Sequence, residues 1–243
     1  MKKLLAIFLL AIPALAFAQH GAQLERAPID LHDKASLQRG AAIFVNHCLN
    51  CHSASAMRYA RLADLGLTEQ QIKDNLMLTS EKVGDTMNAA MEKDVAKAAF
   101  GVVPPDLSLV GRSRGPDWLY TYFKSFYRDP ASKTGWNNLL FPNVAMPHVL
   151  WESQGEQALE VTERKDRNTG DVTHVRKLVL ERPGTLDKIA YDRQVADLVN
   201  YLAYMAEPAQ ADRKLWGILV LFFLAGFFVL VLMLKHEYWK DVR

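Results

Sequence analysis

The chain has 243 residues, half of them hydrophobic, and its 29 basic and 27 acidic side chains leave a formal net charge of +2. These numbers exclude a disordered or collagen-like chain, and two cysteines are too few for a disulfide-rich scaffold. They fit one ordinary domain with an added membrane element. The small net charge is an average, because basic residues flank an apolar run near each end of the chain.

The N-terminus has the pattern of a secretory signal. Lys2 and Lys3 precede an apolar run over residues 4–17, which ends on small residues. A first transmembrane helix is the alternative, but the run is short for a bilayer and Pro13 interrupts it. We therefore expect residues 1–18 to be a signal peptide and the mature protein to be exported from a bacterial cytoplasm.

A second apolar run covers residues 215–234 without a charged or strongly polar side chain. As a helix it would be about 30 Å long, which matches the hydrocarbon core of a bilayer. A buried core helix is the alternative, but this run has no polar face to turn toward water. The slight excess of basic residues after the run predicts an anchor over 213–236, a cytoplasmic tail at 237–243 and an exported domain at 19–212.

The predicted exported domain is acidic. Residues 19–212 contain 22 basic and 25 acidic side chains. This balance disfavours a nucleic-acid partner and favours a basic soluble protein, which opposite charges would steer toward the domain.

Four helices are predicted in this domain from apolar periodicity and from end signals. Asp33 is the N-cap of the first, and Gly40 on that helix would let another helix approach closely. Proline suits the first turn of the third. In chain order the helices cover 34–47, 69–100 with breaks, 116–127 and 192–205.

Irregular segments rich in proline and glycine separate these helices at 101–115 and 128–147. Long loops in a compact domain usually serve a function. The stretch 159–180 mixes strand-forming residues with a polar centre and predicts a β-hairpin. The expected fold is therefore mainly α, with loop and β-hairpin insertions and one C-terminal transmembrane helix.

Cys48, Cys51 and His52 form the strongest chemical signal in the chain, in the order Cys-Leu-Asn-Cys-His. Two thiols three positions apart can add to the vinyl groups of one haem, and the adjacent histidine then serves as an axial ligand of the iron. A thioredoxin-like pair would sit in a βαβ pattern, and a tetrahedral zinc site would need further cysteines. The motif predicts a c-type cytochrome with one covalently attached haem.

The second axial ligand of the iron is predicted to be Met146. It lies between two prolines that restrict the backbone of its loop. His148 is the nearest alternative, and Met77, in a predicted helix, is a weaker one. Helical spacing predicts core packing for three other methionines: Met87, Met91 and Met205.

Four segments of the chain resemble the cytochrome c1 family, the membrane-anchored haem subunits of the quinol:cytochrome c oxidoreductase (bc1) complex. They are the haem motif with its preceding helix, Pro104-Pro105-Asp106-Leu107-Ser108, Ala145-Met146-Pro147, and Met205-Ala206-Glu207-Pro208 leading into Arg213-Lys214 and the anchor. The resemblance covers nearly the whole mature chain in the family's order and implies a class I c-type cytochrome domain.

The resemblance also implies roles for individual residues. The loop 104–108 would line the haem pocket, and an arginine after it would pair with a haem propionate; we select Arg114, with Arg112 as the alternative. The chain departs from the family at His148, where mitochondrial members commonly have further prolines, and at Trp118, which takes an aromatic position after the arginine. Covalent attachment and axial ligation fall by position on Cys48, Cys51, His52 and Met146.

The resemblance implies an electron-transfer subunit that is no enzyme by itself. It would accept electrons from the Rieske iron–sulfur subunit, which quinol reduces on cytochrome b, and pass them to a soluble cytochrome c. It would sit in the bacterial inner membrane with its haem domain in the periplasm. The alternatives are an independent membrane-tethered electron shuttle and an exported thiol–disulfide oxidoreductase.

Overall fold

The computed structural model describes residues 24–165 and 172–241. The predicted signal peptide at residues 1–18 and the tip of the predicted hairpin lie outside the described residues. Helices dominate, and the strands form three separate antiparallel pairs, β1–β2, β3–β4 and β5–β6. In chain order the elements are α2 (Lys34–His47), β1 (Ala54–Arg58), the 3-10 helix η2 (Tyr59–Leu65), α3 (Glu69–Asn75), β2 (Thr86–Met87), α4 (Lys93–Phe100), α5 (Val110–Ser113), α6 (Pro116–Lys124), β3 (Phe126–Arg128), β4 (Trp136–Asn138), α7 (Trp151–Gln154), β5 (Gly155–Lys165), β6 (Val172–Pro183), α8 (Lys188–Ala206) and α9 (Gln210–Trp239).

Helices α2 and α8 cross at Gly40, as the sequence predicts. A Cβ atom on this glycine would lie 2.0 Å from the carbonyl oxygen of Asp197, so only glycine permits the observed contact. The Asp197 carboxylate also accepts two hydrogen bonds from the guanidinium of Arg39, at 2.6 and 2.9 Å. Phe44 and Tyr201 pack in the same interface, with ring centroids 5.6 Å apart. The crossing fixes the helix that ends at the cysteine motif.

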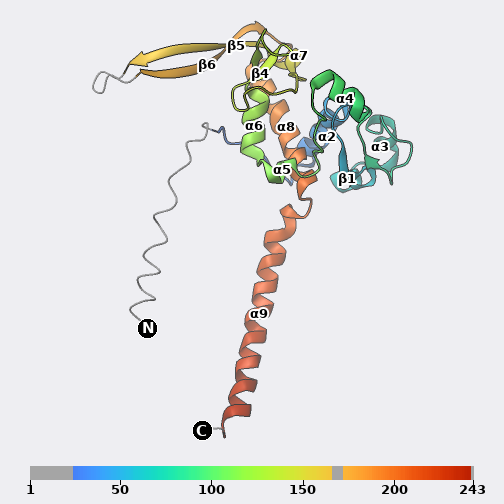
Figure 1. Cartoon of the computed structure of the whole chain (residues 1–243). Coiled ribbons are helices and arrows are strands. Elements are labelled where there is room, and N and C mark those ends of the chain that lie inside the picture. The colour runs from blue at the N-terminus through green and yellow to red at the C-terminus, as the bar shows by residue number, and fades with distance from the viewer. Residues whose placement is uncertain (1–23, 166–171, 242–243) are drawn as a thin grey trace.

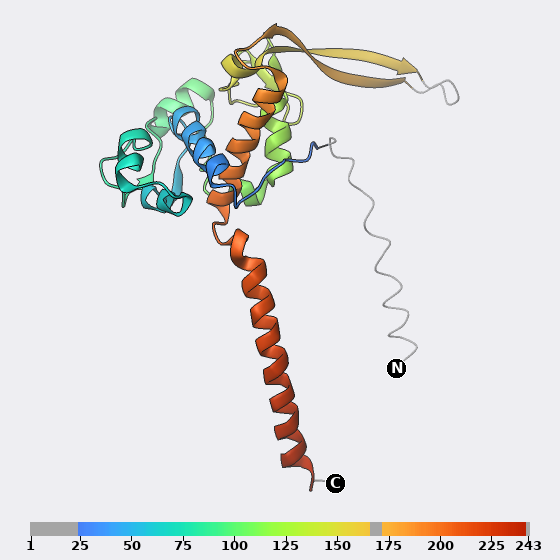
Figure 2. The ribbon, with the colours of Figure 1, turned by 180° about the vertical axis from the view of Figure 1, so that it is seen from behind.

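A second close approach joins α5 to α8. A Cβ atom on Gly111 would lie 2.4 Å from the carbonyl oxygen of Leu202. In both ribbon views α8 stands between α2 and α6 (Figures 1 and 2), and its residues 198–205 are buried. Helix α8 is therefore the centre of the core, and the segments that carry the candidate site pack around it.

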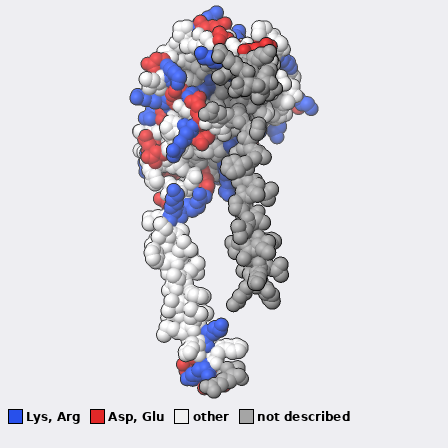
Figure 3. Space-filling view, turned by 90° about the vertical axis from the view of Figure 1, so that its left-hand side faces the viewer, with Lys and Arg blue, Asp and Glu red and all other residues white. Residues whose placement is uncertain are grey.

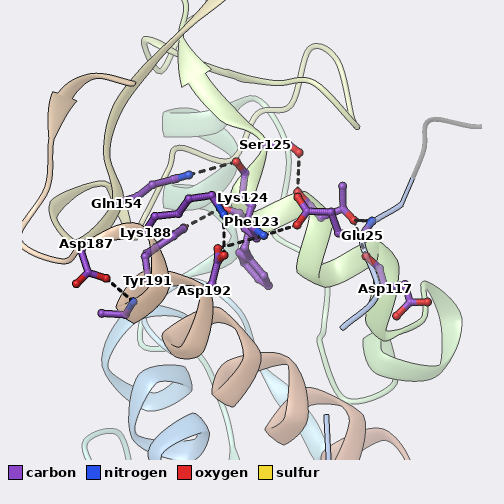
Figure 4. Close-up of polar contacts among 12 residues, drawn as sticks. Glu25, Asp117, Phe123, Lys124, Ser125, Gln154, Asp187, Lys188, Tyr191 and Asp192 are labelled. Atoms are coloured by element: carbon purple, nitrogen blue, oxygen red, sulfur yellow. Dashed lines mark hydrogen bonds and ion pairs between the residues drawn. The ribbon is translucent and has the colours of Figure 1, made fainter. Parts of the chain in front are cut away.

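Lys124, at the end of α6, ties the N-terminal segment to α8 (Figure 4). Its side chain is 10% exposed, and its ammonium pairs with Asp192 at 3.1 Å and with the carboxylate of Glu25. Burial lowers the pKa of Lys124, but the hydrogen bonds and charges of the two carboxylates outweigh burial, so the pKa is raised overall. Beside this cluster, the hydroxyl of Tyr191 donates a hydrogen bond to the carbonyl of Phe123 at 2.8 Å.

Two predicted helix boundaries are wrong. Helix α8 starts at Lys188 instead of residue 192, because the side chain of Asp187 accepts a hydrogen bond from the backbone N–H of Ala190 and caps the helix one turn earlier. Helix α6 ends at Lys124, before the predicted residue 127, because the next residues form β3 and pair with β4. The prediction over 69–100 included breaks, and the structure has two short helices there, α3 and α4, whose outer ends at Glu69 and Phe100 are the predicted ones.

The segment between α3 and α4 contains strand β2, which pairs with β1 beside the cysteine motif. Met87 therefore lies in a strand, where it is fully buried, and not on the predicted helical face. Met91 lies outside both helices, and its backbone N–H donates to the carbonyl of Asn50 at 2.9 Å. Met77 follows the end of α3. The core position predicted for Met87 is confirmed, whereas its predicted helix is wrong.

The predicted hairpin is confirmed and is longer than expected. Strands β5 and β6 pair from Gly155 with Pro183 to Lys165 with Val172, and the ribbon projects away from the helices (Figure 1). Glu207 and the two residues after it turn the chain from α8 into α9, with the Glu207 carboxylate paired to Arg213. Helix α9 is the one described helix long and apolar enough to cross a membrane. Its apolar length lies between basic residues at both ends (Figure 3).

Candidate haem site

The cysteine motif forms a tight turn at the end of α2. Cys48 caps the helix, and its backbone N–H donates to the carbonyl of Phe44 at 2.8 Å. The backbone N–H groups of Cys51 and His52 both donate to the carbonyl of Cys48, at 3.0 and 2.8 Å. Both thiols and the imidazole therefore belong to one rigid turn, placed by the α2–α8 crossing.

Both thiols are held in the protonated form. Cys48 and Cys51 are not joined in a disulfide. Burial and the neighbouring Cys51 raise the pKa of Cys48 to about 12, and burial raises that of Cys51. Reactive redox cysteines have a lowered pKa, often at a helix N-terminus. Here the motif lies at a helix C-terminus, whose negative dipole end disfavours a thiolate, so the site lacks the features of a thiol–disulfide oxidoreductase.

His52 is prepared to bind a metal through one ring nitrogen. Its Nδ1 lies 2.8 Å from the carbonyl oxygen of Pro105. A carbonyl only accepts hydrogen bonds, so Nδ1 carries the hydrogen and the neutral ring leaves Nε2 as a donor for a metal. Burial lowers the pKa of His52, against the opposing effects of the Pro105 carbonyl and the charge of Asp106. The neutral form that iron requires is therefore favoured.

The predicted pocket loop, 104–108, is fastened next to His52 by its own side chains. The Asp106 carboxylate accepts hydrogen bonds from the backbone N–H and the hydroxyl of Ser55, at 2.8 and 2.7 Å, and from the backbone N–H of Ser108 at 2.8 Å. Burial raises the pKa of Asp106, but these hydrogen bonds outweigh burial and lower it overall. The loop presents the Pro105 carbonyl to the imidazole.

Met146 is partly exposed, and its thioether accepts a hydrogen bond from the hydroxyl of Tyr122, with oxygen and sulfur 3.4 Å apart. Burial raises the pKa of Tyr122, and the charge of Arg114 opposes this effect. The phenol therefore stays protonated and remains a donor. Sequence analysis missed Tyr122, because the contact joins α6 to a loop 24 residues further along the chain.

Two buried asparagines hold the loop that carries Met146. The side-chain oxygen of Asn138 accepts hydrogen bonds from the backbone N–H groups of Leu140 and Phe141, at 2.9 and 3.0 Å. The side-chain oxygen of Asn137 accepts from the N–H of Asn143 at 2.8 Å. Asn143 has a φ of 62°, a left-handed conformation that asparagine tolerates better than most residues. Hydrogen bonds to Asn137 and Asn138 therefore hold the conformation of the loop, and the prolines in the sequence did not predict these contacts.

His148, the alternative ligand, is enclosed by aromatic rings. Its ring stacks on Phe126 with centroids 4.8 Å apart and meets the edge of Trp136 at 5.2 Å. The residue is 2% exposed, and neither ring nitrogen has a hydrogen-bond partner that meets ordinary geometry among the described residues. Burial lowers the pKa of His148 to about 4, with the Gln154 side chain opposing. The enclosed ring favours Met146 over His148 as the ligand.

Arg114 lies at one end of a row of stacked side chains, here called the aromatic ladder, in which Trp118 and Tyr122 lead to Met146. Its guanidinium is 4.9 Å from the ring centroid of Trp118 and 5.7 Å from that of Phe141. Trp118 in turn stacks on Tyr122 with centroids 4.9 Å apart. These contacts place Arg114 beside the Met146 loop, which favours it over Arg112 as the arginine of the site.

The donors on the turn of the cysteine motif are suited to a haem. Among residues 24–165 and 172–241, no group of three or more histidine, cysteine or carboxylate side chains could hold a metal ion. One neutral imidazole beside two thiols matches the needs of a haem, because the porphyrin supplies most ligands of the iron and the thiols attach the porphyrin.

Comparison with known proteins decides the family. The family model described as "Cytochrome C1 family" matches residues 25–176 and 184–242. This chain belongs to the cytochrome C1 family.

The relatives that the chain resembles agree in length as well as in sequence. It is 48% identical to a protein named cytochrome c1 from Allochromatium vinosum, over 100% of this chain and 99% of the relative. It is 49% identical to a protein of Nitrosomonas europaea named ammonia monooxygenase gamma subunit, over 99% and 100%. It is 29% identical to cytochrome c1 of Rhodospirillum rubrum, over 87% and 84%.

Membership confirms several predictions. The chain is a member of the family of bc1 haem subunits, its cofactor is a covalently bound haem c, and its fold is that of the family. Helix α9 is consistent with a single membrane span in a membrane-anchored bacterial protein.

Proposed function

We propose that Cys48 and Cys51 attach one haem c and that His52 and Met146 are the axial ligands of its iron. The hydrogen bond from His52 Nδ1 to Pro105 carries this assignment, because it leaves the other nitrogen of a neutral ring as the one that would bind iron, on the same turn as both thiols. When bound, the haem supplies a one-electron Fe(III)/Fe(II) couple, and a thioether ligand favours the reduced form relative to a second histidine.

We propose Arg114 as the residue that pairs with a haem propionate. Its position over Trp118 and Phe141 supports this role, because the aromatic faces hold the guanidinium at the end of the ladder beside Met146. A buried carboxylate is best paired by such a pre-positioned fork of donors. Its positive charge would offset the negative propionate.

The protein then accepts electrons from the Rieske iron–sulfur subunit and passes them to a soluble cytochrome c, within a complex that also contains cytochrome b. Family membership supports this path. The acidic balance of residues 19–212 supports a basic acceptor. Electron transfer to a basic cytochrome c should slow as the salt concentration rises, because salt screens the attraction. A rate that does not change with ionic strength would contradict this docking.

Replacing Met146 with leucine tests the ligand assignment. The variant should lose the weak near-infrared sulfur-to-iron band and have a substantially lower reduction potential. Met77→Leu and His148→Leu are matched controls and should keep the band. If Met146→Leu keeps the band and Met77→Leu loses it, the ligand is Met77. If the wild-type protein lacks the band and His148→Leu changes the haem spectrum, the ligand is His148.

Phosphatase fusions test the membrane topology that we propose, with residues 1–18 as a signal, 19–212 in the periplasm, 213–236 in the inner membrane and 237–243 in the cytoplasm. Alkaline phosphatase is active only after export. A fusion after Ala206 should be active and a fusion after Arg243 inactive. The reverse pattern would overturn the topology.

Purification in mild detergent tests the assembly. A bc1 subunit should co-purify with a b-type cytochrome and an iron–sulfur protein. A lone haem protein would support an independent membrane-tethered shuttle. Co-purification with a monooxygenase instead would follow the name of the Nitrosomonas europaea relative and contradict the bc1 assignment.

A further inference from the structure

The hydroxyl of Tyr122 has one hydrogen-bond partner among the described residues, and that partner is the sulfur of Met146. A buried phenol usually donates to an oxygen, such as a carbonyl. Tyr191 does so, because its hydroxyl meets the carbonyl oxygen of Phe123 at 2.8 Å. Tyr201 also has a sulfur acceptor, because its hydroxyl donates to the sulfur of Met87 at 3.6 Å, but Met87 is fully buried in β2. The sulfur acceptor of Tyr122 differs because it belongs to the residue that we propose as the iron ligand.

The tyrosine is held so that its hydroxyl stays directed at the sulfur. The residue is 8% exposed, and its ring stacks on Trp118 with centroids 4.9 Å apart and meets Phe126 edge-on at 5.0 Å. Its backbone carbonyl accepts a hydrogen bond at 2.8 Å from the side chain of Asn138, which also anchors the start of the Met146 loop. Tyr122 therefore connects α6 to the Met146 loop in two ways, through its hydroxyl to Met146 and through its backbone carbonyl to Asn138.

We propose that Tyr122 is a positioning residue that holds the Met146 thioether and raises the reduction potential of the centre by hydrogen bonding to its sulfur. This inference rests on the ligand assignment above. A ferric centre carries one more positive charge than a ferrous centre, and the hydrogen of a donated hydrogen bond carries a partial positive charge. The donor therefore disfavours the oxidised state more than the reduced state, by electrostatics in a site of low polarity.

Two phenylalanine variants of the full-length haem protein test the role. Tyr122→Phe keeps the ring and its stacking but removes the hydrogen bond to sulfur. Tyr191→Phe is the matched control, because it also removes one buried tyrosine hydroxyl from its acceptor, but that acceptor is a carbonyl oxygen. A merely structural role would therefore give similar changes in the two variants.

Potentiometric titration should show that Tyr122→Phe shifts the equilibrium toward the oxidised form by about three- to tenfold, or ~28–59 mV for one electron. Tyr191→Phe should leave the potential unchanged, and both variants should keep the near-infrared sulfur-to-iron band. If Tyr122→Phe keeps the wild-type potential and the band, the inference is wrong while the ligand assignment stands. If the wild-type protein lacks the band, both are overturned.

Discussion

Replacing Gly40 with alanine has two opposite effects on stability: it favours the helix, and it disturbs the packing of α2 against α8. Alanine favours a helix over glycine by about 1 kcal/mol. The new Cβ atom, however, would lie 2.0 Å from the carbonyl oxygen of Asp197 and 2.7 Å from the Cβ of Tyr201. An ordinary contact begins near 3.4 Å, so α2 and α8 would have to separate by about 1.4 Å (3.4 less 2.0).

The cost in packing should exceed the gain in helix propensity. Overpacking costs about 1–3 kcal/mol, and the upper end applies because the obstacle is backbone. After the gain in propensity, the net loss is about 2 kcal/mol, or a fall in Tm of about 4–8 °C for a domain of this size. Thermal unfolding of the haem protein, followed by circular dichroism, measures it. Because α2 carries the cysteine motif, the near-infrared band should weaken as well.

Gly84→Ala is the control for this prediction. A Cβ atom at Gly84 would meet nothing within 4 Å, and the residue does not have a positive φ. Its Tm should stay the same or rise slightly, because alanine restricts the unfolded chain. If Gly40→Ala is as stable as Gly84→Ala, the close crossing of α2 and α8 is not what requires glycine at residue 40.

Three further substitutions test polar contacts that hold the fold or the candidate site. Lys124→Met should lower the free energy of unfolding by about 1–3 kcal/mol, less than for a fully buried pair because Glu25 is half exposed while Asp192 is mostly covered. Because the pKa of Lys124 is raised in the folded protein, urea titrations should show a constant loss in the free energy of unfolding up to about pH 10. This loss should shrink as the pH rises through the folded pKa. If the loss stays unchanged above the folded pKa, the pairing is contradicted. Asp106→Asn should cost about 1–2 kcal/mol at neutral pH, and this difference should disappear as the pH falls from about 4 through the lowered folded pKa. A difference that grows in acid would show that the carboxylate is not stabilised by its hydrogen bonds. Asn138→Ala should cost about 2–4 kcal/mol, because two N–H groups and one carbonyl lose a buried partner, and an unchanged near-infrared band would argue that the Met146 loop is positioned by other contacts.

Local signals predicted several elements well. Asp33 caps α2 as expected, since its side chain accepts from the backbone N–H of Ser36 within the same turn. The hairpin was predicted from its strand-forming residues and polar centre. Strand β2, in the interruption of the helix predicted over 69–100, was missed because it forms only by pairing with β1, about 30 residues away in the chain, and nothing local marks that pairing. Lys188 at the start of α8 was missed because the prediction followed apolar periodicity and overlooked Asp187 as a cap.

The sequence by itself determined the chemistry of the protein. Adjacent residues suffice to attach a haem and to supply one ligand, so spacing alone predicted a covalently attached haem, which family membership confirms. Cys48, Cys51 and His52 are the residues that this spacing proposes for it. The apolar run of α9 was equally evident, because a bilayer imposes a length and an absence of charge that need no tertiary context.

The tertiary structure decided how that chemistry is held and tuned. The tautomer of His52 depends on a carbonyl 53 residues away, and the environment of the Met146 sulfur depends on Tyr122, from another element. The resemblance had already selected Arg114 over Arg112, and the contacts of Arg114 with Trp118 and Phe141 in the folded chain support that choice. Directional contacts between distant segments form when the chain folds around α8, and no periodicity or motif encodes them locally.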